Sequence, residues 1–310
     1  MKAARVTRFG GPEVLEVEER PRPEPGPGEV VLEVHAAGVG FADLLQREGA
    51  YPGGPRPPFV PGSEAAGVVV ARGEGVDLPL GARVIALTAG GLYATHARVP
   101  AARCAPWPAS LDAPHAAALG VSGLTALGAL VRVARAQEGE TVWIPAAGGA
   151  LGGVALQVAA CLGLRAVAFA STAEKRALAA ESYAYADARE APPPDVVLDG
   201  VGGDFQRVAL RRLRPFGRLI AVGASAGPPP AVDPLGLLHA SAGLQGFHLR
   251  ALLAEPAEVA GLWRTLTGWV DAGRLTPTVS GVFPLCDAGA AQTSLLDRAR
   301  VGKPVLEVGP

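Results

Sequence analysis

The chain has 310 residues, a length typical of two domains. Apolar residues make up 49% and charged residues 18%, which provides for a large core and excludes a disordered chain. Its 28 basic and 29 acidic side chains give a net charge of −1, which argues against binding nucleic acid or an anionic membrane through general electrostatics.

The first hundred residues are predicted to be mainly β structure. Short β-rich segments bounded by Gly and Pro occur at residues 30–34 and 83–87. Residues 21–28 are typical of a rigid loop that joins strands, and residues 41–48 predict one short helix. The first residues, MKAARVTRFGG, lack the apolar segment of a secretory signal.

From about residue 140 the pattern changes to strands alternating with helices. The expected strands are residues 141–146, 165–170, 195–199 and 218–222, with a last strand at 244–249. The expected helices are residues 149–162, 171–180 (capped by Ser171) and 204–213. This alternation predicts a doubly wound parallel sheet covered on both faces. We therefore interpret the apolar windows 113–131 and 141–164 as buried α/β core, not as membrane spans.

The end of the chain changes pattern again. Helices are expected at residues 255–272 and at 288–299, the second capped by Asp287, and a final strand at 304–308. That strand is expected to return to the first domain. The predicted division is therefore a discontinuous β domain of residues 1–119 and 251–310, and an α/β domain of residues 120–250.

A glycine-rich turn lies where the first α/β strand meets its helix. It reads Ala147-Gly148-Gly149-Ala150-Leu151-Gly152, a GxGxxG pattern with Ala in the first place. Gly149 lets the backbone approach a diphosphate, Gly152 lets the helix pack on the strand, and the helix N-terminus offers free N–H groups to an anion. Within a βαβ unit this motif predicts a dinucleotide site.

The residues after the second strand indicate which dinucleotide is bound. An NAD site usually places Asp or Glu there to bind the ribose 2′-hydroxyl. Here the strand ends without an acid, and Ser171, Lys175 and Arg176 follow. These residues leave room for a 2′-phosphate and offset its charge, so NADPH is the predicted cofactor. The alternative is that Lys175 and Arg176 only form a solvated helix face.

Metal and hydrolase chemistry are not favoured. The three cysteines lie far apart in the sequence, which excludes structural zinc with C-x2-C spacing and a disulfide scaffold, and fits a reducing cytoplasm. Spacing alone does not exclude a catalytic zinc held by scattered ligands. The five histidines form no metal spacing. Residues 223–227 read GxSxG, as in the nucleophile elbow of hydrolases, but three prolines follow Gly227 where the elbow needs a helix.

Taken together, the motifs resemble the zinc-free medium-chain dehydrogenases/reductases of the quinone oxidoreductase (zeta-crystallin-like) type. The resemblance covers nearly the whole chain, and it rests on the glycine-rich turn together with the segments GVGFAD, PGSEAAGV, DVVLD and GKPVL, at residues 38–43, 61–68, 195–199 and 302–306. It implies a GroES-like β-barrel domain, a Rossmann domain and an active site in the cleft between them. Zinc-dependent relatives have Cys at Gly40 and His at Ser63, with a third ligand near Val121, so the resemblance implies no metal.

The resemblance also assigns site residues. Gly40, Phe41 and Tyr51 are expected to line the substrate pocket, and the family usually has Asn where this chain has Gly40, so the pocket should be roomier and more apolar. No catalytic acid is identified. The residues implied to bind NADPH are Thr125, Ala147, Gly148, Gly149, Ala150, Leu151, Gly152, Ser171, Lys175, Tyr185, Gly223, Ala224, Phe247, His248 and Leu249.

The function expected from the resemblance is hydride transfer from NADPH to a quinone or a similar electron-poor acceptor. An NADPH-dependent alkenal or enoyl reductase is the alternative within enzymes, and a non-catalytic, crystallin-like NADPH-binding protein is the alternative outside them. The expected partners are a small-molecule acceptor and a second copy of the chain, paired through the last Rossmann strand. The expected location is the cytoplasm.

Overall fold

A computed structural model describes residues 1–228 and 230–309 and divides the chain into two compact units. Unit 1 comprises residues 1–121 and 276–310, and unit 2 comprises residues 122–275. The second boundary differs from the predicted one, because residues 251–275 fold with unit 2. Arg132 pairs with Glu258 there, at 3.2 Å, and Arg274 donates a hydrogen bond to the Cys161 carbonyl oxygen.

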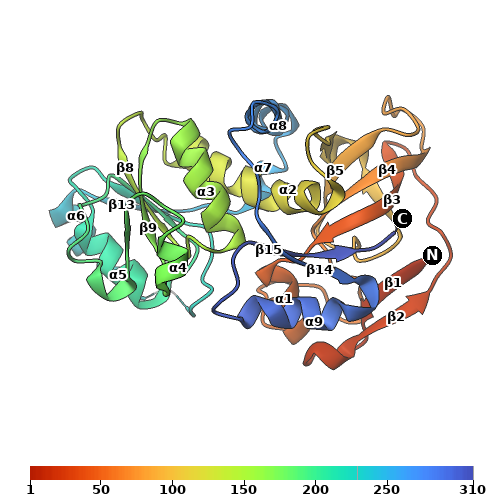
Figure 1. The fold of residues 1–310 in the computed structure, drawn as a ribbon, viewed down its shortest axis with the longest axis horizontal. Coiled ribbons are helices and arrows are strands. Elements are labelled where there is room, and N and C mark those ends of the chain that lie inside the picture. The colour runs from red at the N-terminus through yellow and green to blue at the C-terminus, as the bar shows by residue number, and fades with distance from the viewer. Residues whose placement is uncertain (229, 310) are drawn as a thin grey trace. The chain divides into compact units, whose positions relative to one another are not determined.

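Unit 1 is built on strands. They are β1 (Lys2–Val6), β2 (Leu15–Glu19), β3 (Glu29–Gly38), β4 (Glu64–Arg72), β5 (Arg83–Leu87), β6 (His96–Pro100), β7 (Cys104–Pro106), β14 (Val279–Pro284) and β15 (Lys303–Glu307). Seven of them form a sheet, in which the path β14-β15-β3-β4-β5-β7 is joined by β6 on β3. The blue strands from the end of the chain join the same sheet as orange β3 from its beginning (Figure 1), since β15 pairs antiparallel with β3. The final strand therefore returns to the first domain, as predicted.

Two short helices flank these strands, α1 (Phe41–Glu48) and α9 (Ala288–Thr293). The short 3-10 helices of the unit are Pro12–Val14, Ala101–Arg103, Leu285–Asp287 and Ser294–Leu296. The predicted helix 288–299 is wrong in its second half. The Thr293 and Ser294 hydroxyls bond to the Gly289 and Ala291 carbonyl oxygens, which competes with regular helix bonds, and Asp287 makes no side-chain cap.

Unit 2 has one six-stranded, fully parallel sheet in the order β10-β9-β8-β11-β12-β13. The strands are β8 (Thr141–Pro145), β9 (Arg165–Phe169), β10 (Ser182–Tyr183), β11 (Val196–Asp199), β12 (Arg218–Ala221) and β13 (Gly243–Gly246). From β8 the chain winds outward to β10, and from β11 it winds the opposite way. Right-handed crossovers then place the two sets of helices on opposite faces. The order reverses between β8 and β11, which is where such sheets bind ligands.

The helices of this unit are α3 (Ala150–Cys161), α4 (Ala173–Arg176), α5 (Gly203–Arg212), α6 (Pro234–Ala240), α7 (Leu249–Leu252) and α8 (Pro256–Asp271), with a 3-10 turn at Tyr185–Asp187. Before them, α2 (Ala113–Gly128) continues into a π-helical turn, Ala129–Val133. This 21-residue stretch is long and apolar enough to cross a membrane, but 78% of its most apolar window is buried. It is a core helix of the kind predicted.

Two predicted elements of unit 2 need correction. The helix after β9 has only four residues, and Thr172, not Ser171, caps it by accepting a hydrogen bond from the Lys175 N–H. The last strand ends at Gly246, three residues before its predicted end. His248 caps α7, because its Nδ1 accepts a hydrogen bond from the Arg250 N–H, and this turns the chain out of the sheet.

Candidate functional site

The glycine-rich turn joins β8 to α3 at the point where the strand order reverses. Ala146 has a φ of 51°, and the Gly149 N–H bonds to its carbonyl oxygen at 2.7 Å, which closes the turn. A Cβ on Gly152 would lie 2.2 Å from that same oxygen, so only glycine fits there. The amides at the start of the 12-residue helix α3 have no acceptor within the helix, which suits an anion.

Tyr185 lies beside this turn. Its hydroxyl accepts a hydrogen bond from the Ala146 N–H at 2.8 Å, and its ring packs edge-on against Phe205 with the ring centroids 5.4 Å apart. Burial raises the pKa of Tyr185, so the hydroxyl keeps its own proton and can donate it. The structure thus brings Tyr185 to the turn, although the two lie almost forty residues apart in sequence.

The end of β9 carries the groups expected to select the dinucleotide. Ser171 is exposed, and the strand ends in Phe169 and Ala170 without an acid. The side chain of Lys175 lies over Gly148, since a Cβ built on that glycine would be 2.7 Å from Lys175 Cδ. The Lys175 side chain therefore lies at the glycine-rich turn near the N-terminus of α3, and exposed Ser171 lies four residues before it in the chain; these groups fit a dinucleotide that carries an additional phosphate.

The loops after β11 and β12 pack on each other. The Ser225 and Ala226 N–H groups donate to the Gly200 and Val201 carbonyl oxygens, and a Cβ on Gly223 would lie 3.1 Å from the Gly200 oxygen. Exposed Gly223 and Ala224 therefore line the same edge of the sheet as the glycine-rich turn. A turn, not a helix, follows Ser225, so the local structure lacks the strand–helix elbow of a hydrolase.

The other residues assigned to the nicotinamide end are distributed over two helices and one loop. Thr125 is 9% exposed within α2. The Phe247 N–H donates to the Ala221 carbonyl oxygen at the end of β12, and its ring lies against Gly128. His248 and Leu249 begin α7. Phe247 is thus fixed at the carboxyl end of the sheet, while His248 has a capping role that the sequence did not predict.

In unit 1, Gly40 and Phe41 begin α1, and Tyr51 follows its end, where the Tyr51 N–H donates to the Leu45 carbonyl oxygen. Asp43 was not identified from the sequence. It is 1% exposed, and its Oδ2 accepts a hydrogen bond from the Gly40 N–H at 2.9 Å. The signal that could have found it is an acid three residues after a helix N-cap.

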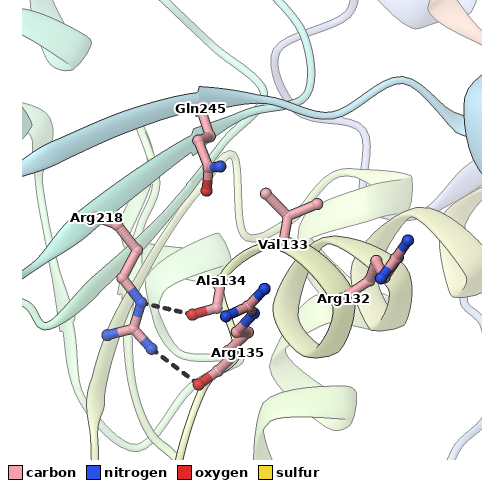
Figure 2. Close-up of a pocket in the computed structure, with 6 residues that line it drawn as sticks. All are labelled: Arg132, Val133, Ala134, Arg135, Arg218 and Gln245. Carbon is pink, nitrogen blue, oxygen red and sulfur yellow. Dashed lines mark hydrogen bonds between the residues drawn. The ribbon is translucent and has the colours of Figure 1, made fainter.

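A pocket of about 550 Å³ also opens on unit 2 (Figure 2), lined by Arg132, Val133, Ala134, Arg135, Arg218 and Gln245. Arg218 is the first residue of β12, whereas the glycine-rich turn follows the carboxyl end of β8. The Arg218 guanidinium is held by Glu140 and by the Ala134 and Arg135 carbonyl oxygens. This pocket is therefore distinct from the dinucleotide site.

Family models match two parts of the chain. Residues 26–109 match "Alcohol dehydrogenase GroES-like domain", and residues 179–306 match "Zinc-binding dehydrogenase". The first match confirms the GroES-like fold predicted for unit 1.

Whole-chain relatives agree with these matches. The synaptic vesicle membrane protein VAT-1 homolog of Rattus norvegicus is 31% identical over 98% of this chain and 83% of its own length. A quinone oxidoreductase of Pseudomonas aeruginosa is 31% identical over 98% of this chain and 99% of its own length. Among solved structures, the quinone oxidoreductase of Thermus thermophilus, also solved in complex with NADPH, is 41% identical with a TM-score of 0.88, covering 99% of this chain and all of that one. The chain belongs to the quinone oxidoreductase family of medium-chain dehydrogenases/reductases.

Proposed function

We propose that this protein is an NADPH-dependent oxidoreductase that transfers a hydride to a quinone or a similar electron-poor acceptor without zinc. The observation that carries the proposal is the group of residues around the glycine-rich turn, with Lys175 over Gly148 and exposed Ser171 where an NAD site has an acid. The similarity to a quinone oxidoreductase solved with NADPH supports the same cofactor and reaction.

Different residues of unit 2 would bind different parts of NADPH. The N–H groups of Ala150 and Leu151 at the start of α3 would bind the diphosphate, with the Tyr185 hydroxyl beside them, while the Gly149 N–H closes the turn. Ser171 and Lys175 would bind the 2′-phosphate, and the loop at Gly223 would take the nicotinamide end. When bound, NADPH supplies the hydride from its nicotinamide ring.

The zinc-free part of the proposal rests on residue types. Gly40 and Ser63 offer no strong zinc ligand, and both are bonded to Asp43. Over residues 1–228 and 230–309, no three His, Cys, Asp or Glu side chains come together to hold a metal. A quinone spreads the charge it receives over its own oxygens, so its reduction does not require a Lewis acid.

The acceptor is tested by anaerobic oxidation of NADPH and of NADH against a panel of quinones and enones. Fast quinone reduction with NADPH supports the proposal. Background rates with quinones and fast reduction of enones would instead identify an alkenal or enoyl reductase, which Gly40 favours because it leaves a roomier, more apolar pocket. Tight NADPH binding without turnover of any acceptor would identify a non-catalytic binding protein.

Replacing Lys175 with Ala should weaken NADPH binding about 10- to 150-fold, because a charge-assisted hydrogen bond is worth roughly 1.5–3 kcal/mol. NADH binding should barely change, since NADH has no 2′-phosphate. Titration calorimetry with both dinucleotides measures this. Arg207→Ala, which removes an exposed cation on α5, is the control and should change neither affinity. Equal losses for NADPH and NADH would contradict the assignment of Lys175.

We also propose that the protein is a homodimer formed through the β13 edge. β13 is the last strand of its sheet and pairs on one side with β12. Exposed apolar side chains lie near these last two strands. Phe216, just before β12, is 84% exposed, and Leu235 and Leu238, on α6 before β13, are 67% and 70% exposed in a helix that buries none of its residues. A strand edge flanked by exposed apolar groups is suited to pairing with its own copy.

Light scattering tests the dimer. We expect a mass of twice the 31.4 kDa of one chain, and Leu238→Lys should shift the protein towards monomer. Leu80→Lys, at a residue of unit 1 that is 61% exposed, is the matched control and should leave the mass unchanged. A monomeric wild type, or a dimer insensitive to Leu238→Lys, would contradict this interface.

The cytoplasm is the proposed location. All three cysteines are free thiols in the structure, which suits a reducing compartment.

A further inference from the structure

Asp43 is the centre of a buried polar cluster in unit 1. Its Oδ2 accepts hydrogen bonds from the Gly40 N–H at 2.9 Å and from the Tyr93 hydroxyl at 3.1 Å. Its Oδ1 accepts one from the Ser63 hydroxyl, also at 3.1 Å. Asp43 is 1% exposed and Tyr93 is fully buried. The carboxyl group thus joins three segments that lie far apart in sequence, at the start of α1, before β4 and before β6.

Ser63 is the side chain through which this cluster reaches the surface of unit 1. Its neighbours Pro61, Gly62 and Glu64 are buried, whereas Ser63 is half-buried. Gly40, which is bonded to the same carboxyl group, begins the helix whose first residues are expected to line the acceptor pocket. The Ser63 hydroxyl is therefore bonded to the same buried carboxyl group as Gly40, the residue that begins the helix expected to line the acceptor pocket.

The surroundings of Asp43 allow it to hold a proton more readily than an exposed aspartate. Burial raises its pKa, the hydrogen bonds from Gly40, Tyr93 and Ser63 lower it, and the charge of Glu64 raises it. Glu64 is itself paired with Lys303. The pKa of Tyr93 is raised well above its usual value, chiefly by burial, so Tyr93 stays a neutral donor.

We propose that Asp43 is the proton source for the reduction and that Ser63 passes this proton to the acceptor. The inference rests on the proposed function, which supplies the hydride from reduced nicotinamide. After hydride transfer the acceptor oxygen carries a negative charge. When Asp43 is protonated, its Oδ1–H donates to Ser63 Oγ and the Ser63 hydroxyl hydrogen points to the acceptor. The acceptor oxygen then takes the Ser63 hydroxyl proton, and Ser63 Oγ takes the proton from Asp43 Oδ1. The electron pair of the broken O–H bond stays on Asp43, where the Gly40 N–H and the Tyr93 hydroxyl stabilise the carboxylate. Solvent reprotonates it through Ser63 before the next turnover.

Ser63→Ala tests the proton transfer, because it removes the hydroxyl that links Asp43 to the acceptor and leaves the Asp43 carboxyl group in place. We expect kcat with a saturating acceptor to fall about 100-fold, the lower end of what a positioned acid contributes, with little change in KM. Ser63→Thr keeps the hydroxyl and should retain most of the rate. Ser294→Ala, which removes a hydroxyl bonded to the Ala291 carbonyl oxygen elsewhere in unit 1, is the control.

The pH dependence of the rate distinguishes a proton-donating Asp43 from one that only supports the structure. The transfer needs protonated Asp43, so the rate should be full below the pKa of Asp43 and fall as the pH rises through it. Tyr93→Phe removes a hydrogen bond that lowers this pKa, so the alkaline limb should move to higher pH. In Asp43→Asn the side chain has no proton to release. This variant should therefore lose most of the rate, and its remaining rate should no longer fall as the pH rises.

Carbon-13 NMR of the Asp43 carboxyl group, recorded without any dinucleotide, reads the same pKa independently of activity. We expect a value above that of an exposed aspartate in the wild type and a higher one in Tyr93→Phe. The proposal is overturned if Tyr93→Phe shifts the alkaline fall of the pH–rate profile and the NMR titration of Asp43 in different directions. It is also overturned if Ser63→Ala retains the wild-type rate. A wild type that oxidises no NADPH with any acceptor would instead overturn the proposed function, and the NMR titration would still report on Asp43.

Discussion

Gly152→Ala should destabilise the protein by about 3 kcal/mol and abolish NADPH binding, because its methyl group would enter the closed turn between β8 and α3. The added Cβ would lie 2.2 Å from the Ala146 carbonyl oxygen and 2.7 Å from Ala147 Cα. Both are backbone atoms, which cannot rotate away as a side chain can. The turn would have to open, and the amides at the start of α3 would lose their alignment. Urea unfolding and calorimetry with NADPH measure the two effects.

The next residue supplies the matched control. A Cβ on Gly153 would meet its nearest neighbour, the Ala147 carbonyl oxygen, at 3.6 Å, an ordinary contact. Gly153→Ala should therefore leave NADPH binding intact and stabilise α3 by about 0.5–1 kcal/mol, the usual gain for alanine over glycine within a helix. If the two variants behaved alike, the close approach at Gly152 would not determine the shape of the turn.

Lys303→Met should cost about 3–5 kcal/mol of stability, because it leaves the Glu64 carboxylate buried without its partner. The two side chains are 3% and 2% exposed and form a direct ion pair. The other oxygen of Glu64 accepts a hydrogen bond from the Val121 N–H at 2.8 Å. The pair therefore ties β15, from the end of the chain, to β4 and to α2 within unit 1.

A double-mutant cycle separates the pair from its surroundings. Glu64→Gln with Lys303→Met removes both charges and should be markedly more stable than Lys303→Met alone. Asp204→Ala, which breaks an exposed pair with Arg207, should change stability little. Additive losses in the cycle, or a small loss for Lys303→Met, would show that the pair is not a main support of unit 1.

Elements governed by local patterns could be predicted from the sequence. Phe41–Glu48 and Arg83–Leu87 match their predicted bounds, since a helix or a strand of that length follows from apolar spacing and from Gly and Pro at its ends. The parallel sheet followed from the alternation of strands and helices. The helix after β9 and the last strand were predicted too long, because the side-chain caps at Thr172 and His248 decide where the chain turns.

The residues of the candidate site also fall into those that a local sequence pattern identifies and those that depend on how distant segments pack. Gly149, Gly152 and Lys175 could be identified because a turn motif and a missing acid are visible in the sequence. Asp43 and Tyr93 could not be paired, because fifty residues separate them and their hydrogen bond depends on how two segments pack. The ion pair of Lys303 with Glu64 was missed for the same reason, since its partners are 239 positions apart in the sequence.

Comparing the affinities of the purified protein for NADPH and for NADH is the most direct test of the central claim, that the turn before α3 and the residues after β9 bind a dinucleotide with a 2′-phosphate. We expect NADPH to bind at least about 10-fold more tightly, from one charge-assisted contact to that phosphate. Equal affinity for the two dinucleotides, or tighter binding of NADH, would contradict it.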